Sequence, residues 1–192
     1  MSTPDEIAEL LIHLGRAARS EDQSALLTPA QWTALRYLAR ANTASRTPSA
    51  FASFHATTRG TATQTLKALE AKGFLSRCEN KLDARSVCYD LTSEGRAVLL
   101  QDPLQDLTQS IAALPEALRE AIASALPMLI AEMARRRVTP AFGTCHDCRH
   151  FEGHDQGAFC ACMAKGLAVS DINLLCVNFN CDAAALPPRL KK

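Results

Sequence analysis

The chain has 192 residues, of which 47% are hydrophobic and 21% charged, and its formal net charge is +1. This composition is typical of a soluble globular domain with an addition, and it contains no apolar run long enough to span a membrane. The near-neutral charge gives no overall signal for nucleic acid, although residues 41–100 carry eight Lys and Arg against five Asp and Glu. The N-terminus lacks the pattern of a signal peptide, so we expect a cytoplasmic protein.

The first part of the chain predicts four helices. One helical face over residues 5–19 carries the apolar side chains Ile7, Leu10, Leu11 and Leu14. Thr28 and Pro29 are suited to the cap and first position of a second helix, which runs to about residue 41. A polar loop follows, and Pro48 begins a short third helix. Thr57 or Thr58 caps a fourth helix that ends at Gly73.

A β-hairpin and further helices are predicted next. Residues 74–78 and 86–91 are short strands joined by a polar turn. Thr92 begins helical structure again, and Pro103 and Pro115 suit the first turns of later helices. The last helix is expected to be kinked by Pro127 and to continue to the three arginines at residues 135–137.

Within this order of elements stand three motifs: LTPAQWTALRYLA, TTRGTATQTLKALEAKGFL and DARSVCYDLTSEGRA. Over about Leu26 to Leu100, the order and these motifs together resemble the MarR family of bacterial transcriptional regulators. It implies a mainly α fold with a small β-hairpin wing (α+β), a winged helix-turn-helix within an α-helical dimer. The fourth helix would then lie in the major groove of double-stranded DNA.

The candidate DNA-binding residues lie on the fourth helix and the wing. Arg, Thr and Gln side chains on such a helix reach base edges and phosphates, and Arg85 at the hairpin tip suits the minor groove. The resemblance implies these roles for Arg59 and Arg85, and implies that Asp83 steadies the wing arginine. A solvated polar surface is the alternative, above all for Gln64 and Lys67. The full candidate set is Thr58, Arg59, Thr61, Thr63, Gln64, Lys67, Asp83, Arg85 and Ser86.

The terminal helices are expected to form a homodimer, as the resemblance also implies. An apolar stripe exceeds what a small winged helix needs to cover, and it contains Ile111, Leu114, Leu118, Ile122, Leu126, Leu129, Ile130 and Met133. An intramolecular helical hairpin is the alternative. We therefore divide the chain into a dimerisation helix (1–25), a DNA-binding domain (26–100), further dimerisation helices (101–139) and a cysteine-rich segment (140–192), here called the tail.

Six of the eight cysteines lie in the tail. A C-x2-C pair lets one turn supply two thiolates to a metal, so we expect a centre bound by Cys145, Cys148, Cys160 and Cys176. Cys162 is the chief substitute for Cys160, and Cys181 is a weaker candidate. An iron–sulfur cluster is preferred to zinc, because the spacing resembles that of high-potential iron–sulfur proteins. A thiol–disulfide switch and the absence of any site are the alternatives.

Two cysteines outside the tail, Cys78 and Cys88, lie on the two predicted wing strands, an arrangement that allows them to face each other but does not require it. They are interpreted either as small buried apolar residues or as a redox pair.

The sequence thus predicts a homodimeric repressor that binds a pseudo-palindromic operator and responds to metal or redox conditions through the tail. No catalytic motif is present, so an enzyme is not expected. The alternative function is a small cytoplasmic redox protein that uses its helices only for dimerisation, but such a protein does not need the basic hairpin tip.

Overall fold

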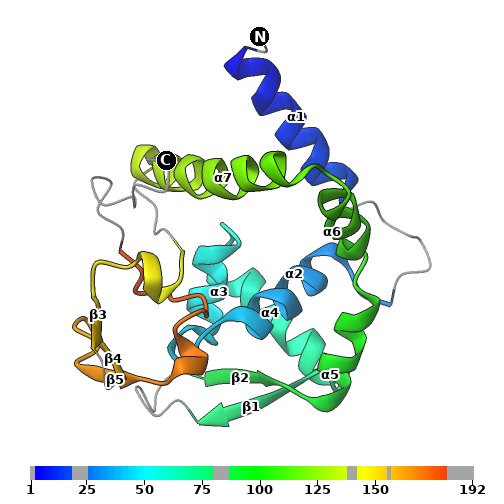
Figure 1. The fold of residues 1–192 in the computed structure, drawn as a ribbon. Coiled ribbons are helices and arrows are strands. Elements are labelled where there is room, and N and C mark those ends of the chain that lie inside the picture. Colours follow the sequence, from blue (N-terminus) through cyan, green and yellow to red (C-terminus); the bar gives the residue numbers. More distant parts are fainter. Residues whose placement is uncertain (1–2, 19–25, 80–86, 138–141, 155–156, 181–192) are drawn as a thin grey trace.

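The structure, a computed structural model, describes residues 3–18, 26–79, 87–137, 142–154 and 157–180. It is mainly helical, with one β-hairpin and a second small sheet (Figure 1). The helices are α1 (Pro4–Ala17), α2 (Pro29–Arg40), α3 (Pro48–Phe54), α4 (Arg59–Ala71), α5 (Ser93–Val98), α6 (Leu104–Ala112) and α7 (Glu116–Arg137), with short 3-10 turns at η1 (Thr43–Ser45), η2 (Leu99–Gln101), η3 (Cys145–Asp147) and η4 (Val169–Asp171). The strands are β1 (Leu75–Glu79), β2 (Val87–Leu91), β3 (Phe151–His154), β4 (Gly157–Cys160) and β5 (Lys165–Leu167).

The predicted helix starts are confirmed by their caps. The Thr28 hydroxyl accepts the Gln31 N–H at 3.3 Å, and the Gln31 side chain accepts the Thr28 N–H at 3.1 Å, which forms a reciprocal capping box before Pro29. The hydroxyl of Thr58 accepts the N–H of Thr61 at 3.1 Å and so caps α4. Each cap satisfies backbone donors that the first helical turn leaves unpaired.

The end of α4 also fixes where the hairpin begins. Gly73 has a φ of +79°, its N–H donates to the Glu70 carbonyl, and the Phe74 N–H donates to the Leu69 carbonyl. This pair of bonds is a Schellman motif, in which glycine takes the left-handed position without steric cost. Because Phe74 is used to close the helix, β1 begins one residue later than the sequence predicted.

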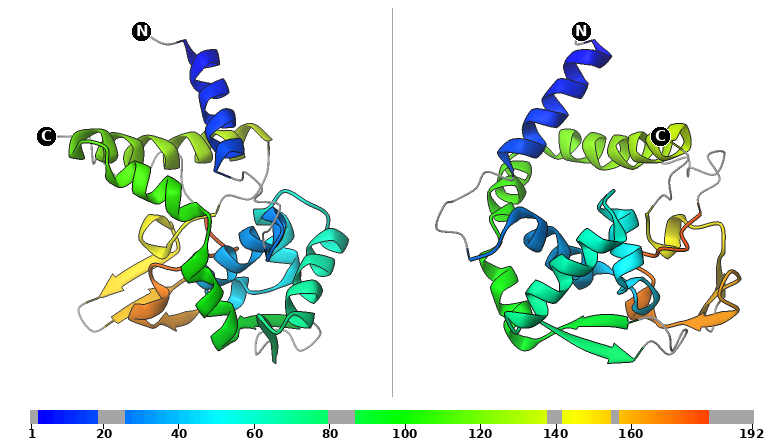
Figure 2. Two further views of the ribbon diagram at one scale, coloured as in Figure 1. Left: turned by 90° about the vertical axis from the view of Figure 1, so that its right-hand side faces the viewer. Right: turned by 180° about the vertical axis from the view of Figure 1, so that it is seen from behind.

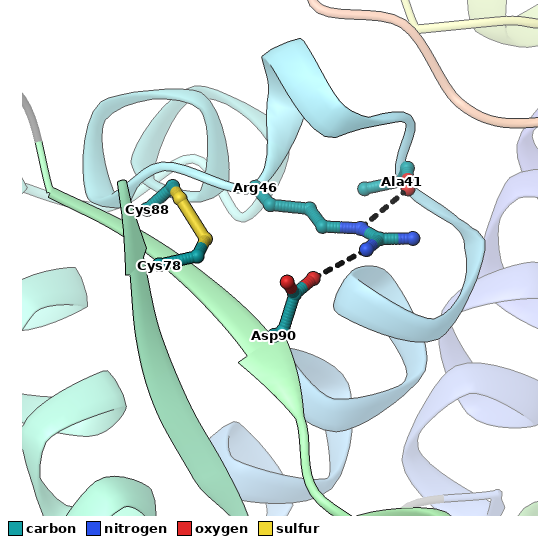
Figure 3. Close-up of a disulfide and its surroundings, with 5 residues drawn as sticks. All are labelled: Ala41, Arg46, Cys78, Cys88 and Asp90. Carbon is teal, nitrogen blue, oxygen red and sulfur yellow. Dashed lines mark hydrogen bonds and ion pairs between the residues drawn. A yellow bond between two sulfur atoms is a disulfide. The ribbon is translucent and has the colours of Figure 1, made fainter. Parts of the chain in front are cut away.

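The hairpin is antiparallel, and its register places Cys78 opposite Cys88. The two residues form a disulfide, with Cα atoms 5.1 Å apart (Figure 3). The sequence analysis interpreted these cysteines either as small buried apolar residues or as a redox pair, and in the structure they are bonded to each other. Cys88 is in addition buried, as a small apolar residue would be. The predicted turn lies outside the described residues.

The main core lies between α2, α3, α4 and the hairpin. Its largest fully buried apolar side chains are Leu35, Tyr37, Leu38, Phe51, Leu66, Leu69 and Tyr89. Helix α5 packs directly on the start of the hairpin, because a Cβ atom at Gly95 would lie 2.1 Å from the Phe74 carbonyl oxygen. Only glycine permits this approach, which sets the direction in which the chain leaves the wing.

Helices α1, α6 and α7 contribute no buried residue to this core. They lie at the end of the molecule opposite the hairpin (Figures 1 and 2). Helix α7 continues through Pro127 to Arg137, as predicted for its end. Among the described helices, none is both long and apolar enough to cross a membrane.

The tail is more ordered than the sequence indicated, because it forms a three-stranded antiparallel sheet in the order β3-β4-β5. Strands of three or four residues that contain Gly153, Gly157 and Gly166 show no apolar alternation, so the pattern gave no signal for them. The tail also packs on the main core, since Phe142, Leu175 and Val177 contact it.

Candidate nucleic-acid interface and cysteine cluster

Helix α4 separates its side chains into two faces. Ala62, Leu66 and Leu69 are fully buried in the core. The remaining surface carries polar residues predicted to contact DNA: Arg59, Thr61, Gln64 and Lys67 are exposed, and Thr63 is half-buried. The helix is therefore held by its apolar face and presents donors and two cations outward.

Some of the predicted hydroxyl contacts are engaged within α4 itself. The Thr58 and Thr61 hydroxyl oxygens lie 2.9 Å apart, and the Thr63 hydroxyl donates to the Arg59 carbonyl at 2.7 Å. These threonine hydroxyls therefore stabilise the first turns of the helix.

The wing is fixed to α4 at its base. The Arg77 guanidinium forms two hydrogen bonds with the Glu70 carboxylate, at 2.8 and 3.2 Å. A two-point contact of this kind fixes orientation as well as distance. The predicted wing residues Asp83, Arg85 and Ser86 lie outside the described residues, so their roles stay predictions.

Arg46, which the sequence analysis did not single out, connects the turn before α3 with the wing. Its Nε donates to the Ala41 carbonyl at 3.0 Å, and its guanidinium pairs with the Asp90 carboxylate (Figure 3). The Tyr89 N–H donates to the Arg46 carbonyl at 2.9 Å, which adds the backbone of this turn beside β2. The loop position of Arg46 in the sequence gave no sign of this long-range role.

The four cysteines predicted as metal ligands converge in the tail. Cys145, Cys160 and Cys176 are buried, and Cys148 is half-buried. The Cys148 N–H donates to the Cys145 carbonyl, and Phe151, opposite Cys160 in the sheet, donates its N–H to the Cys148 carbonyl. The substitute ligand Cys162 is exposed, and Cys181 lies outside the described residues.

Electrostatics also indicates that the four thiols are neighbours. Burial, and after it negative charge on Cys176, Cys148 and Cys160, raise the pKa of Cys145 to about 11. In the described parts of the chain, no three His, Cys, Asp or Glu side chains stand at the spacing that holds a metal ion. The backbone thus brings the thiols to one place, while their sulfur atoms are not drawn together around an ion.

Asn42 is a second residue that the sequence analysis missed. Its Oδ1 accepts the Ser45 N–H at 3.0 Å and the Ser45 hydroxyl at 2.6 Å, while its side chain also hydrogen-bonds Cys176. Burial raises the pKa of Cys176, and the hydrogen bonds from Asn42 and from the Asn178 backbone oppose that increase. In the sequence, Asn42 looks like an ordinary turn residue of a polar loop, and its burial becomes visible only in the structure.

The arrangement of α2, α3, α4 and the hairpin defines a winged helix-turn-helix domain. Residues 27–86 match the model of the MarR family, which places the match on this domain. No curated protein matches the chain.

Solved structures of MarR regulators share the fold. MepR from S. aureus in its DNA-binding conformation is 19% identical, with a TM-score of 0.58, over 69% of this chain and 99% of that chain. A MarR transcriptional regulator from Methanosarcina mazei Go1 is 16% identical, with a TM-score of 0.55, over 69% and 96%. A MepR–DNA complex from S. aureus is 20% identical, with a TM-score of 0.53, over 69% and 99%. These matches confirm the predicted fold class.

Proposed function

We propose that this chain is a transcriptional regulator that binds double-stranded DNA through α4 and the wing. The observation that carries the proposal is that α4 has one buried face and one exposed face. Leu66 and Leu69 are buried and fix the helix in the core. Arg59, Gln64 and Lys67 are exposed on its other face. The MarR family match over residues 27–86 and the similarity to MepR, which was solved with DNA, support it.

In this mechanism α4 enters the major groove with its N-terminal turns toward the bases. Arg59 forms hydrogen bonds with base edges, while Lys67, two turns further on, neutralises a phosphate. The contact between Arg77 and Glu70 holds the hairpin at a fixed angle to α4. Arg85 at the hairpin tip then reaches the adjacent minor groove, where narrow sequences concentrate negative potential.

We also propose that the partner of α1, α6 and α7 is a second copy of the chain. These helices contain no buried residue within the protomer, yet they carry large exposed apolar side chains at Ile7, Leu10, Ile12, Leu14, Ile111, Leu118, Ile122, Leu126, Met128, Leu129, Ile130 and Met133. An apolar surface of this extent is characteristic of an interface. A twofold dimer would place two α4 helices on the half-sites of a pseudo-palindromic operator, and such occupancy represses transcription.

Regulation by metal or redox conditions is assigned to the tail cysteines. The competing function is that of a small redox protein that uses the helices only for dimerisation. That function does not explain why α4 exposes the cations Arg59 and Lys67. It would also not need the Arg46 and Arg77 contacts that fix the wing.

The DNA-binding assignment is tested with an operator selected from random duplexes, with affinities measured by fluorescence anisotropy at several salt concentrations. Arg59→Ala should lose about 1–3 kcal/mol and relax base preference, whereas Lys67→Ala should weaken binding to all sequences and reduce the salt slope by about one. Lys165→Ala, an exposed cation on β5, is the matched control and should bind like the wild type. If the α4 variants also bind like the wild type, the docking assignment is wrong.

The dimer is tested by sedimentation of the full chain and of a protein without residues 1–20. The full chain should sediment as a dimer at micromolar concentration, and the truncated one should dissociate more readily. A monomeric full-length protein at that concentration would contradict the proposal.

A further inference from the structure

The described interior of the tail is made of cysteine. Within residues 142–154 and 157–180, the residues that are buried are Cys145, Cys160 and Cys176. No large apolar side chain of these ranges is fully enclosed, so hydrophobic burial contributes little to the stability of the tail. Small segments with too little core are usually held together by disulfides or by a metal.

These thiols come from three separate segments that the backbone holds together. Cys145 begins η3 and Cys148 follows its last residue, and the Cys148 carbonyl accepts the N–H of Phe151, the register partner of Cys160. Cys176 is added by a bridge to Gly143, whose carbonyl accepts the Cys176 N–H at 3.0 Å. Four thiols from these three segments, with one C-x2-C turn among them, match the ligand types of a tetrathiolate metal centre.

We propose that Cys145, Cys148, Cys160 and Cys176 bind one thiolate-coordinated metal centre, an iron–sulfur cluster or a zinc ion, and that this centre fastens the tail to the turn between α2 and α3. On binding, each thiol releases its proton to solvent and its sulfur bonds to the metal, which draws the four sulfur atoms together. Cys162 lies outside this set, because it is exposed two residues beyond Cys160.

The surroundings of Cys176 suit a metal-bound thiolate. The Asn42 side chain and the Asn178 backbone act on its thiol as hydrogen-bond donors and lower its pKa, against the effect of burial. Hydrogen bonds of this kind favour the charged sulfur and orient it, as the outer partners of metal ligands generally do.

Asn42 also joins the centre to the winged helix. Its Oδ1 holds both donors of Ser45, and the Ser45 hydroxyl oxygen accepts the Val177 N–H at 2.8 Å, so the turn and the tail share one network. Leu175, which precedes Cys176, forms two further backbone hydrogen bonds with this turn. Its N–H donates to the Arg40 carbonyl at 2.7 Å, and its carbonyl accepts the Asn42 N–H at 2.9 Å.

The same turn contacts the wing through Arg46, which binds both Ala41 and Asp90. The metal centre therefore lies next to the element that positions α3 and β2. Any effect of the centre on DNA binding rests on the proposed function, whereas binding of the metal does not.

Metal content of the full-length protein tests the centre directly. The protein is purified anaerobically from cells supplied with iron and zinc, and iron, acid-labile sulfide, zinc and visible absorption are measured. A brown protein with iron and sulfide, bleached by air, supports the cluster, and a colourless protein with about one zinc per chain supports the zinc ion. A protein that carries neither overturns the proposal.

Cysteine variants test the assignment of ligands. Cys148→Ser and Cys176→Ser should each lose at least most of the metal, and Cys162→Ser should retain it. Trp32, the single tryptophan of the chain, reports whether the winged helix of each variant remains folded. Equal loss of metal in Cys162→Ser and Cys148→Ser, with Trp32 emission unchanged, would overturn the ligand set.

The connection through Asn42 is tested with Asn42→Asp, which keeps the acceptor for Ser45 but replaces the donor to Cys176 with a carboxylate. EDTA should remove the metal from this variant at least fivefold faster than from the wild type. Thr47→Asp, the same kind of change at the cap of α3, is the control and should release metal at the wild-type rate. Equal rates for Asn42→Asp and the wild type would refute the connection. Because these measurements use no DNA, their failure leaves the DNA-binding proposal intact.

Discussion

The winged helix and the tail differ in the kind of side chain that they bury. In the winged helix, α2, α3, α4 and the hairpin enclose a continuous set of Leu and aromatic side chains, and its helices begin at well-formed caps. In the described tail, strands of three or four residues surround thiols. The first region carries its own driving force for folding, while under the proposed metal centre the second depends on chemistry that its thiols provide.

This difference teaches that contact with a stable domain does not replace a core. Phe142, Leu175 and Val177 of the tail rest against the winged helix, but each stays only partly buried.

The largest effect is expected when the metal is removed from the tail. Structural zinc sites contribute on the order of 10 kcal/mol to the folding of small modules. EDTA or Cys148→Ser should therefore open the tail to trypsin at the exposed residues Arg149 and Lys165, while Trp32 emission stays native. Mass spectrometry of the fragments measures this. A tail that resists trypsin after complete loss of metal would mean that it has a sufficient core.

The core of the winged helix should be the next most sensitive. Leu66 is fully buried beneath α4, so Leu66→Ala should lower the free energy of unfolding by about 2–5 kcal/mol. Lys67→Ala on the exposed face should change it by at most about 0.5 kcal/mol. Urea unfolding followed by Trp32 fluorescence compares the two. Similar midpoints for both variants would show that α4 is not held by its apolar face.

The wing disulfide should contribute a smaller amount. The bond between Cys78 and Cys88 closes a short loop, with a sequence separation of 10. Cys78→Ser should therefore lower the free energy of unfolding by about 2–3 kcal/mol in non-reducing buffer. Urea unfolding measures the change, and the same comparison with both proteins reduced is the control. Two free thiols at these positions in the wild-type protein, found by mass spectrometry, would contradict the prediction.

The smallest effect is expected at a surface ion pair remote from both regions. Hydrogen bonds from Arg135, and then from Arg136, lower the pKa of Glu132 to about 2 from its usual 4.5. A lowered pKa stabilises the folded chain above pH 4.5, and this contribution disappears as the pH falls toward 2. Thermal unfolding of Glu132→Gln should therefore differ slightly from the wild type at pH 5 and above, and should not differ near pH 2. A difference that grows on acidification would contradict this assignment.

Local chemistry made much of the winged helix predictable from its sequence. Thr28 with Pro29, Thr58 and Gly73 determine where helices begin and end through bonds to residues within a few positions. The hairpin strands were likewise predicted with Cys78 on one and Cys88 on the other, and only the use of Phe74 in the helix cap shifted the first strand; their direct pairing became visible in the structure. Interactions of short range leave a pattern in the sequence.

The features that sequence analysis missed depend on contacts between distant residues. Asn42 and Arg46 lie in a polar loop, and their roles become visible only when Cys176 and Asp90 approach them in space. The strands of the tail lack alternation because they have no apolar face to bury. The convergence of the four cysteines was inferred from ligand chemistry rather than from secondary structure. The wing-tip residues 83, 85 and 86 remain predictions.

The contact between Ala41 and Leu175 has a consequence for the order of events during synthesis. Leu175 follows Leu91, the last residue of the hairpin, by 84 residues. At a translation rate of about 5–20 residues per second, the ribosome needs roughly 4–17 s to add that stretch. The winged helix thus has time to fold before the tail emerges. Each new chain passes through a period in which its winged helix is formed and the turn at Asn42 has not yet met Cys176.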